Sequence, residues 1–476
     1  MPKGTTISEI RMVIGLEIHA QLATRTKLFC NCSSDYFRAP PNTHSCPVCL
    51  GMPGALPVLN ERAVELALQA ALALDCEIPR RCKFDRKNYF YPDLPKGYQI
   101  SQYDQPLAQR GHFRPSGGEE VRIRRVHLEE DAGKLVHDER SGRSLVDLNR
   151  AGVPLIEIVT EPDLSSPEAA AQFMRELRQL LRYLGVSHAE MEKGELRCDA
   201  NISLSVNGQR GTKTEIKNMN SFQAVEAALS AEARRQRRLL AVGEPIIQAT
   251  LGWNPASGQV ELQREKEEAE DYHYLPEPDL LPLEIAADRT ERLRQAMPEL
   301  PAQRRARWQR EYRLPDYDIR LLSEERELAD YFEQVVRCFP QPKEVSNWMM
   351  SELLRLLGEE PQRGLALAPD DFAQVLQMVS QGQLNRNKAK QVIAEAFKSD
   401  RTPQQIVAEQ GWAQISDEAT LMSLATEVLR ENPEAAAGYR SGNAKVLGFL
   451  IGKLMAKTGG QANPKLATEV LRAALK

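Results

Sequence analysis

Short runs of apolar or alternating residues, bounded by glycine and proline, recur through the first three-fifths of the chain. Clear examples lie at residues 121–126, 155–159 and 200–206. Alternation with a period of two, and short continuous apolar runs, are typical of β-strands. We therefore predict strands at these positions.

Longer segments, with apolar positions three and four residues apart, lie between these strands. They cover residues 61–74, 166–184 and 221–242, and this spacing predicts amphipathic helices. The second segment begins with Ser166 and Pro167, which suit a helix N-cap and a first helical turn. Strands and helices interspersed in this way indicate an α+β fold for the front of the chain.

The pattern changes near Asp288 to helical spacing alone, with frequent prolines between the segments. We therefore predict three domains. An α+β domain covers residues 1–290, an all-α helical domain covers residues 291–401, and a small all-α tail covers residues 402–476.

The end of the tail is basic. From residue 435 onward Glu469 is the single acid, and the cations are Arg440, Lys445, Lys453, Lys457, Lys465, Arg472 and Lys476. Such a bias is found both on phosphate-binding surfaces and on ordinary solvated helix faces. Both interpretations stay open at this point.

Length, net charge and the distribution of apolar residues limit the class of protein to which the chain can belong. The chain has 476 residues, which is enough for several cores, and its net charge of -4 gives no overall basic field, so any contact with RNA must be local. It contains neither a run of about 20 apolar residues nor a secretory pattern at its start. We therefore expect a cytoplasmic protein with no membrane partner.

Four of the eight cysteines form two close pairs. Cys30 and Cys32 are followed, after 13 intervening residues, by Cys46 and Cys49. Four thiolates in this arrangement can converge on one tetrahedral cation, for which zinc is the preferred metal. We therefore predict a structural Zn²⁺ in a loop-borne knuckle. The remaining cysteines show no disulfide spacing, which agrees with a reducing compartment.

Acidic residues occupy several predicted strands where apolar or neutral residues are usual. Glu17 and His19 alternate with Leu16 and Ile18, so both polar side chains point to one face. The other acids are Glu129, Glu130, Asp131, Asp199 and Glu215. Taken singly, each is more often structural than functional. Taken together, they suit a Mg²⁺ site for nucleotide chemistry, with Lys87 and Arg197 as cations for the phosphates.

Several catalytic classes lack their sequence motifs. The chain contains no glycine-rich phosphate loop of the Walker or Rossmann kind and no Gly-x-Ser-x-Gly elbow, which disfavours P-loop enzymes and classical hydrolases. Residue types and spacing alone therefore support a hypothesis of metal-assisted phosphoryl transfer.

The front domain contains several long motifs. They are VIGLEIH (13–19), FDRKNYFYPD (84–93), HLEEDAGK (127–134), DLNRAGVPLIEI (147–158) and LRCDANIS (196–203). These motifs closely resemble the B subunits of the aspartyl/glutamyl-tRNA amidotransferases, the GatB/GatE family. The similarity continues through residues 448–452 and 462–465 and so covers essentially the whole chain.

This resemblance implies a front domain shaped as a cradle, with a fold like glutamine synthetase and guanido kinases, and helical domains that help to hold tRNA. It implies that ATP phosphorylates the side-chain carboxylate of Glu on tRNA(Gln) or Asp on tRNA(Asn), and that ammonia then displaces phosphate. The ammonia would come from glutamine hydrolysis in an A subunit, braced by a small C subunit. The chain would thus be part of a carbon-nitrogen ligase.

The resemblance also assigns residues. By motif, the positions around the family's Mg²⁺ site are Glu17, His19, Glu130, Asp199 and Glu215, with Glu129 as their neighbour. Lys87 and Arg197 stay the candidates for binding the nucleotide phosphates. This chemistry needs positioning and electrostatics rather than a covalent nucleophile, which agrees with the lack of a nucleophile motif.

Two features depart from the common family pattern. The zinc cysteines occur only in some members, so we expect the metal to be structural. A segment that usually reads Asp-Tyr-Arg-Tyr-Phe-Pro-Glu-Pro-Asp has His273 and Leu275 in residues 271–279. Histidine would make any anion contact there dependent on pH, and we assign His273 no catalytic role.

Two other functions remain as alternatives. The chain could be a non-catalytic RNA-binding scaffold, which the basic tail would suit. It could also be a free-standing small-molecule ligase, which the long helical region disfavours. The sequence does not indicate which misacylated tRNA is the substrate.

Overall fold

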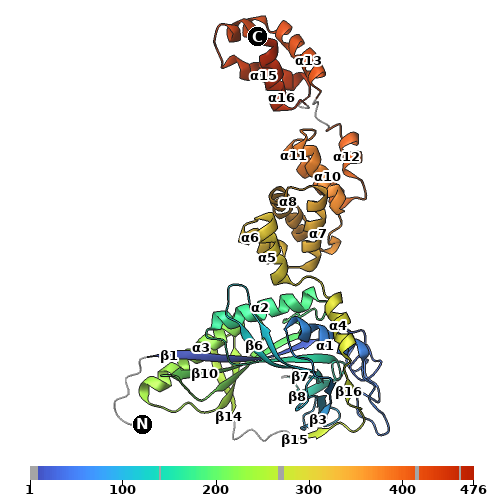
Figure 1. The fold of residues 1–476 in the computed structure, drawn as a ribbon, viewed down its shortest axis with the longest axis vertical. Helices are drawn as coiled ribbons and strands as arrows, with labels where there is room; N and C mark the ends of the chain where they lie inside the picture. Colours follow the sequence, from blue (N-terminus) through green and yellow to red (C-terminus); the bar gives the residue numbers. More distant parts are fainter. Residues whose placement is uncertain (1–8, 139–140, 266–272, 413–416, 460–461, 476) are drawn as a thin grey trace. The chain divides into compact units, whose positions relative to one another are not determined.

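The computed structural model describes residues 9–138, 141–265, 273–412, 417–459 and 462–475. The chain divides into two compact units, Met1–Gln303 and Arg304–Lys476. Each unit is described separately (Figure 1).

A large mixed sheet dominates the first unit. In the described part it has nine strands, in the order β14-β13-β12-β10-β1-β9-β6-β5, with β11 paired to β10. The strands are β1 (Ile10–Gln21), β5 (Ala108–Phe113), β6 (Val121–Glu130), β9 (Pro154–Thr160), β10 (Leu196–Val206), β11 (Gln209–Arg210), β12 (Thr214–Met219), β13 (Ala249–Asn254) and β14 (Gln259–Glu265).

β1 lies near the middle of this sheet and pairs antiparallel with β10 on one side and β9 on the other. β12 and β13 form a parallel pair. The three strands predicted from the sequence are confirmed as parts of β6, β9 and β10, each longer than the apolar run that indicated it.

Helices cover one face of the sheet (Figure 1). They are α1 (Glu61–Ala73), α2 (Pro167–Tyr183), α3 (Phe222–Val242) and α4 (Ala287–Ala296), and the first three confirm the predicted helices. Ser166 caps α2 by accepting a hydrogen bond from the backbone N–H of Ala169, and Pro167 lies in its first turn. On β1 the residues Ile14, Leu16 and Ile18 are at most 1% exposed and belong to the core below these helices.

The opposite face of the sheet carries smaller sheets. One has the order β15-β3-β4, and the others pair β16 with β2 and β7 with β8. The strands are β2 (Arg81–Cys82), β3 (Asp85–Asn88), β4 (Tyr98–Ser101), β7 (Lys134–Asp138), β8 (Arg143–Asp147), β15 (His273–Pro276) and β16 (Leu283–Glu284). Because successive strand residues point to opposite faces, the polar residues that alternate with the β1 core face this side.

The second unit is helical where it is described. Its first part consists of α5 (Pro301–Tyr312), α6 (Asp316–Leu322), α7 (Arg326–Cys338), α8 (Pro342–Trp348), the π-helix η1 (Met349–Leu353), α9 (Leu354–Glu359), the 3-10 turn η2 (Pro361–Arg363), α10 (Pro369–Ser380), α11 (Arg386–Lys398) and α12 (Pro403–Glu409). Trp308, Phe332 and Phe372 are fully buried among these helices.

The last four helices share a core of their own. They are α13 (Glu418–Glu431), α14 (Pro433–Arg440), α15 (Val446–Lys457) and α16 (Pro464–Leu475), and the core includes Leu421, Leu450 and Leu471. The predicted tail also contained α12, but α12 packs against α10 and α11. A mixed sheet with helices followed by a helical region agrees with the α+β class, while the three-domain division stays a prediction.

None of the helices in the described ranges has the length and apolar character needed to cross a membrane.

Candidate active site

A cavity of about 460 Å³ lies between the open face of the large sheet and the β15-β3-β4 sheet. Charged side chains of both signs dominate its walls. The lining residues used below are Glu17, His19, Lys87, Ser101, Arg125, His127, Glu129, Asp131, Glu157, Arg197, Asp199, Glu215, Lys217, Arg264 and Tyr274.

Strand register brings these side chains together. Glu17 pairs with Asp199 on β10, and His19 pairs with Glu157 on β9. Glu157 is in turn opposite His127 on β6. Residues directly opposite on neighbouring strands have side chains on the same face, so these pairs form a row of polar groups across four strands.

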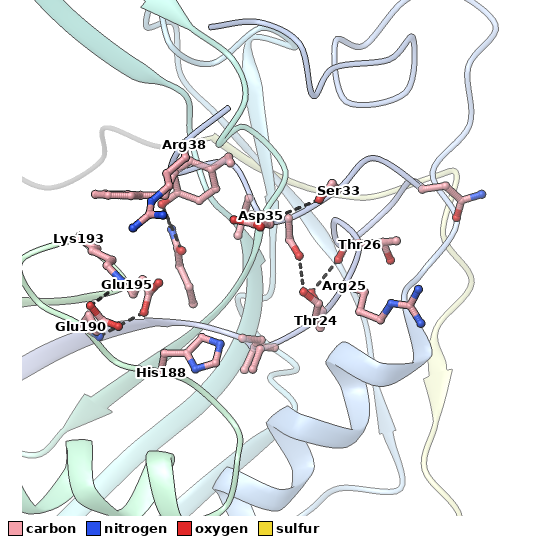
Figure 2. A pocket seen from close by; sticks show the side chains of 18 residues that line it. Thr24, Arg25, Thr26, Ser33, Asp35, Arg38, His188, Glu190, Lys193 and Glu195 are labelled. Atoms are coloured by element: carbon pink, nitrogen blue, oxygen red, sulfur yellow. Dashed lines mark hydrogen bonds and ion pairs between the residues drawn. The ribbon is translucent and has the colours of Figure 1, made fainter. Parts of the chain in front are cut away.

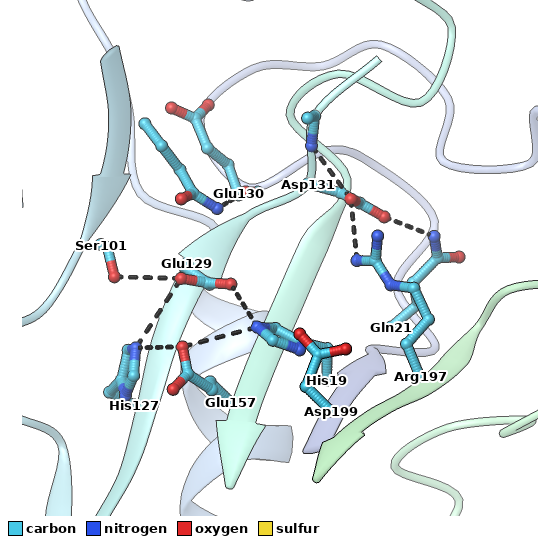
Figure 3. A network of polar contacts seen from close by, with 12 residues as sticks. His19, Gln21, Ser101, His127, Glu129, Glu130, Asp131, Glu157, Arg197 and Asp199 are labelled. Atoms are coloured by element: carbon cyan, nitrogen blue, oxygen red, sulfur yellow. Dashed lines mark hydrogen bonds and ion pairs between the residues drawn. The ribbon is translucent and has the colours of Figure 1, made fainter. Parts of the chain in front are cut away.

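The first group in the cavity contains His19, Glu129 and Glu157. The Nε2 atom of His19 lies 3.3 Å from Glu129 and 3.5 Å from Glu157, as Figure 3 shows. One ligand atom from each of the three lies within 4.8 Å of the others. Two carboxylates and an imidazole at this spacing can hold a divalent cation.

His127 lies beside this group and is only 2% exposed. Its Nε2 atom is 3.3 Å from Glu157 and 3.7 Å from Glu129, while its Nδ1 atom has no hydrogen-bond partner in the described structure. The imidazole of His127 therefore contacts the same two carboxylates as His19.

The electrostatics of this group depend on the two histidines. Burial alone would lower the pKa of His19, but its hydrogen bonds to Glu129 and Glu157 outweigh burial and raise the pKa to about 10. Burial would raise the pKa of Glu129, but hydrogen bonds from His127 and His19 lower it well below its ordinary value. Burial would also lower the pKa of His127, but the charge of Glu157 and hydrogen bonds to Glu129 and Glu157 raise it. Without a metal, the carboxylates of Glu129 and Glu157 therefore favour the protonated form of both imidazoles.

A second acidic group lies beside the first and contains Glu17, Asp199 and Glu215. The ammonium of Lys217 joins two of them, at 2.6 Å from Asp199 and 3.4 Å from Glu215. Burial and the nearby carboxylates, Glu157 foremost, raise the pKa of Glu17. Carboxylates that repel one another in this way favour a bound cation.

Further cations surround the two acidic groups. Arg197 pairs with Asp131 at 2.9 Å, and Arg125 lies 3.7 Å from Glu157. The Nε atoms of both arginines are buried and have no partner in the described structure. Lys87 and Arg264 also line the cavity, so several cations are available for the oxygens of a polyphosphate.

Most of the residues expected from the sequence come together here. Glu17, His19, Asp199 and Glu215 line the cavity, as does Glu129, and so do the two expected phosphate-binding cations, Lys87 and Arg197. Strands β1, β6, β10 and β12 of the large sheet supply these residues together with Lys87 of β3.

Glu130 does not join them. It follows Glu129 on β6, so its side chain points to the opposite side, where it forms a buried ion pair with Lys96 and accepts a hydrogen bond of 2.8 Å from the backbone N–H of Ile100. Its carboxylate lines a separate small cavity beside Cys30 and Cys49. Alternation along the strand directs Glu129 rather than Glu130 toward His19 and Glu157. The assignment of Glu130 to the metal-binding group stays a prediction.

His273 begins β15 and is exposed, with its backbone carbonyl accepting a hydrogen bond from Asn88. Its neighbour Tyr274 lines the cavity, whereas His273 is not among the lining residues. Asp271 and Tyr272 of the same motif lie outside the described residues.

Sequence reasoning missed several residues of the site. Glu157 was part of a predicted strand but was not singled out, although an acid between Ile156 and Ile158 is the same signal that identified Glu17. His127 and Lys217 lie within motifs that were recognised, yet neither was given a role. Nothing in the sequence pattern indicated a role for Arg125, because an arginine on a half-exposed strand is common.

The four predicted zinc cysteines also come together. The Sγ atoms of Cys30, Cys32, Cys46 and Cys49 all lie within 4.8 Å of one another, and no other group in the described structure offers four sulfur ligands. This arrangement suits a tetrahedral metal site with no open position for a substrate. The finding agrees with a structural zinc.

Without a metal, the negative charge of the cysteine group is centred on one sulfur. A hydrogen bond from Cys30 lowers the pKa of Cys49 to about 4, whereas the hydrogen bond to Cys49 raises the pKa of Cys30 and burial raises the pKa of Cys32 to about 11. The ammonium of Lys27, which is 1% exposed, lies 3.7 Å from the Cys49 sulfur and 2.6 Å from the carbonyl of His44. A buried cation beside a cluster of sulfurs offsets the negative charge that a four-thiolate site carries.

Comparison with known proteins gives matches along most of the chain. Residues 12–291 match the family model for the GatB/GatE catalytic domain, and residues 330–475 match the model for the GatB domain. The first match covers the whole cavity described above.

Several curated relatives are similar over their full length, and the name of each is that of the B subunit of an aspartyl/glutamyl-tRNA(Asn/Gln) amidotransferase. The relative from Thermodesulfovibrio yellowstonii is 50% identical over 471 residues, which cover 98% of this chain and 99% of the relative. The relative from Moorella thermoacetica is 51% identical over 474 residues, with the same coverage. The relative from Thermotoga maritima is 48% identical over 473 residues, covering 97% of this chain and 98% of the relative.

Proposed function

The chain belongs to the GatB/GatE family, and from this premise we propose that it is the B subunit of a tRNA-dependent amidotransferase. The reaction is the ATP-dependent conversion of Glu-tRNA(Gln) or Asp-tRNA(Asn) to Gln-tRNA(Gln) or Asn-tRNA(Asn). The observation that carries the proposal is the pair of adjacent acidic groups in one cavity, ringed by arginine and lysine side chains.

The chemistry requires activation of a carboxylate. A side-chain carboxylate is a poor acyl donor, because its leaving group would be oxide. An oxygen of the substrate carboxylate attacks the γ-phosphorus of ATP, the bond to the β-phosphate oxygen breaks, and ADP leaves. The lone pair of ammonia then attacks the acyl carbon, the bond to phosphate breaks, and the nitrogen loses a proton to give the amide.

Mg²⁺ fits the cavity, because hard oxygen ligands converge there from several strands. We propose that His19, Glu129 and Glu157 hold one ion. We further propose that Glu17, Asp199 and Glu215, which line the same cavity, hold a second one. When bound, Mg²⁺ neutralises charge on the polyphosphate and on the transferring phosphoryl group.

The chain's own cations complete this environment. Lys87, Arg125 and Arg197 lie on the cavity wall, where a guanidinium or ammonium can bind phosphate oxygens as negative charge spreads over them. Lys217 lies between Asp199 and Glu215, so it would supply a further cation on this wall of the cavity.

Ammonia must come from elsewhere, because a glutaminase needs an activated nucleophile. Ser101 is the one serine among the described residues that line the cavity, and its hydroxyl donates a hydrogen bond of 3.1 Å to Glu129. The lowered pKa of Glu129 makes this carboxylate a weak base that does not activate the serine. No cysteine is among those lining residues.

We therefore propose that a separate A subunit hydrolyses glutamine and that a small C subunit supports the assembly. The relatives are named as B subunits, so they are components of a multi-subunit enzyme.

The remaining parts have supporting roles. We propose that Cys30, Cys32, Cys46 and Cys49 bind a structural Zn²⁺, and that the α+β unit is a cradle related to glutamine synthetase and guanido kinases. We further propose that residues 291–401 and 402–476 are helical domains that hold tRNA. A cytoplasmic location suits a role in translation, and all eight cysteines are free thiols in this structure.

The test is an assay of the reconstituted three-subunit complex with ATP, Mg²⁺, glutamine and each misacylated tRNA. The proposal expects ADP and the amidated tRNA in equal amounts, and loss of both in Glu129→Gln. If tRNA binds but no amide or ADP forms, the chain is an RNA-binding scaffold. If free glutamate is amidated without tRNA, the chain is a small-molecule ligase.

A further inference from the structure

His19 and His127 flank the same two carboxylates, those of Glu129 and Glu157, from opposite sides (Figure 3). The exposure of the two imidazoles differs. The side chain of His19 is 22% exposed, whereas that of His127 is 2% exposed. His19 is therefore the imidazole that an ion or a substrate in the cavity can approach, and His127 lies on the buried side of the carboxylates.

The two oxygens of Glu129 are divided between these sides. The Oε1 atom lies 3.3 Å from Nε2 of His19. The Oε2 atom lies 3.7 Å from Nε2 of His127 and accepts a hydrogen bond of 3.1 Å from the hydroxyl of Ser101. One oxygen is thus held on the buried side, and this directs the other oxygen toward His19.

Glu157 is held by His127 through a single oxygen. Its Oε2 atom lies 3.3 Å from Nε2 of His127 and 3.5 Å from Nε2 of His19, while its Oε1 atom lies 3.7 Å from Arg125. A carboxylate oxygen can accept from more than one direction. The Oε2 atom can therefore accept the N–H of His127 and still face His19.

The burial of His127 is unfavourable unless its contacts with the carboxylates offset it. The Nδ1 atom has no hydrogen-bond partner in the described structure, and burying an unpaired polar nitrogen costs free energy. A leucine side chain would fill a similar space without that cost. Among the described residues, the polar groups that the imidazole contacts are the carboxylates of Glu129 and Glu157.

We propose that His127 is a positioning residue of the active site, which orients the carboxylates of Glu129 and Glu157 for a divalent cation through its Nε2–H. The inference rests on the proposed function, because it names the residue that prepares the proposed metal site. Two adjacent carboxylates repel each other, and an N–H donor between them reduces this repulsion while the site is empty. Groups that orient metal ligands from outside commonly change metal affinity by about 10- to 100-fold.

The experiment measures binding of Mn²⁺, which prefers the same oxygen ligands as Mg²⁺, to the complete three-subunit complex without ATP or tRNA. His127→Gln keeps an N–H donor near the position of Nε2, whereas His127→Leu fills a similar volume without a donor. Neither substitute can be protonated, so the comparison separates the hydrogen bond from the charge of the imidazole.

His188→Gln is the matched control. His188 is an exposed histidine that lines a separate cavity of about 1010 Å³, and Figure 2 shows its position there. Its substitution removes an imidazole from the same unit of the chain without touching either carboxylate. The control should therefore bind Mn²⁺ as the wild type does.

We expect His127→Leu to bind Mn²⁺ at least about tenfold more weakly than His127→Gln at the site that contains His19. Rescue by glutamine would assign the effect to the N–H, because a purely structural role would favour the apolar leucine. Electron spin echo envelope modulation of the bound Mn²⁺ reports coordinated imidazole nitrogens. The nitrogen coupling should be present in the wild type and in His127→Gln, and absent in His19→Gln.

Equal Mn²⁺ affinities in the two His127 variants, or tighter binding in His127→Leu, would overturn the inference. Loss of the nitrogen coupling in His127→Gln would also overturn it, since His127 would then be a ligand itself. If His127→Leu does not assemble into the complex, His127→Asn replaces it, because its shorter amide does not reach the position of Nε2 and should weaken binding equally. Failure of the proposed function would appear differently, as a wild-type complex that binds Mn²⁺ but forms no amidated tRNA.

Discussion

Glu129 and Glu130 are consecutive residues of β6, and their carboxylates lie on opposite sides of the strand. Glu129 lies 3.3 Å from the Nε2 atom of His19 in the cavity of the candidate active site, whereas Glu130 accepts a hydrogen bond of 2.8 Å from the backbone N–H of Ile100 and pairs with Lys96. Both side chains are almost completely buried, so each carboxylate has a specific environment.

This relationship predicts different consequences for two equivalent changes. Glu129→Gln removes a metal-binding charge without changing shape, so transamidation should fall by about 100-fold or more. The affinity of the complex for tRNA should stay the same. Single-turnover measurement of ADP formation would locate the loss at the phosphorylation step.

Glu130→Gln should leave Mg²⁺ affinity unchanged. It should instead lower the free energy of unfolding by about 3 kcal/mol, because it leaves the ammonium of Lys96 buried without its partner. Isothermal titration with Mg²⁺ and denaturant unfolding distinguish the two variants. A loss of Mg²⁺ affinity in Glu130→Gln would contradict the position of this carboxylate outside the metal-binding group.

The charge state of His19 predicts a dependence of stability on pH in the metal-free protein. Its pKa is about 10 in the folded state and 6.5 in the unfolded state, so its contribution to stability is complete below pH 6.5. That contribution is lost as the pH rises from 6.5 through 10. In EDTA, the difference in Tm between wild type and His19→Gln should therefore shrink over this range.

The affinity for Mg²⁺ should increase with pH, whereas the stabilising contribution of protonated His19 decreases. A metal ion must displace the proton from His19, so Mg²⁺ affinity should rise with pH, by up to about tenfold per unit below pH 10. His19→Gln should lose most of this dependence. Titrations at about pH 7 and about pH 8.5 test it, and a wild-type affinity that does not change with pH would contradict protonation of His19.

Zinc should be present at one equivalent per chain. Cys46→Ser removes one of four sulfur ligands that lie within 4.8 Å of one another, so the variant should contain much less zinc and melt at a lower temperature. Elemental analysis of the purified protein is the measurement. Cys338→Ser is the matched control, because Cys338 is exposed and belongs to the helical unit.

The basic residues of the tail should differ in their effect on tRNA binding. Lys457 pairs with Glu431 at 2.6 Å and with Glu427 at 3.0 Å, so its charge is already balanced. Lys445→Ala should reduce the salt slope of tRNA binding by about 0.9, as expected for one lost phosphate contact. Lys457→Ala should leave the slope unchanged.

Deleting residues 417–476 should raise the KM for tRNA while glutamine hydrolysis by the A subunit persists. This boundary follows the separate core of the last four helices. Identical salt slopes in the full and truncated complexes would show that the basic bias is an ordinary solvated surface. Lys476, the last of the basic residues, lies outside the described part of the chain.

Periodicity was enough to predict much of the secondary structure. The strands within β6, β9 and β10 and the helices α1, α2 and α3 follow from local patterns, because burial of one face imposes a period of two or 3.6. The cysteine group was also predictable, since its ligands form two local pairs whose spacing reflects the geometry of a single metal ion.

The composition of the catalytic cavity required the tertiary structure. Alternation put Glu17 and His19 on one face, but it could not show that Glu157 is opposite His19, because register between strands distant in sequence leaves no local signal. For the same reason, the choice between Glu129 and Glu130 depended on which face of β6 meets the cavity.

The sequence by itself determined the α+β class, the paired cysteines and the family motifs, since each depends on residues that are close together along the chain. Only the tertiary structure decided that the side-chain amide of Gln21 donates hydrogen bonds to both Tyr36 and Asp131. Those three residues come from β1, the cysteine knuckle and the turn after β6, and only the packing of these segments brings them within hydrogen-bonding distance.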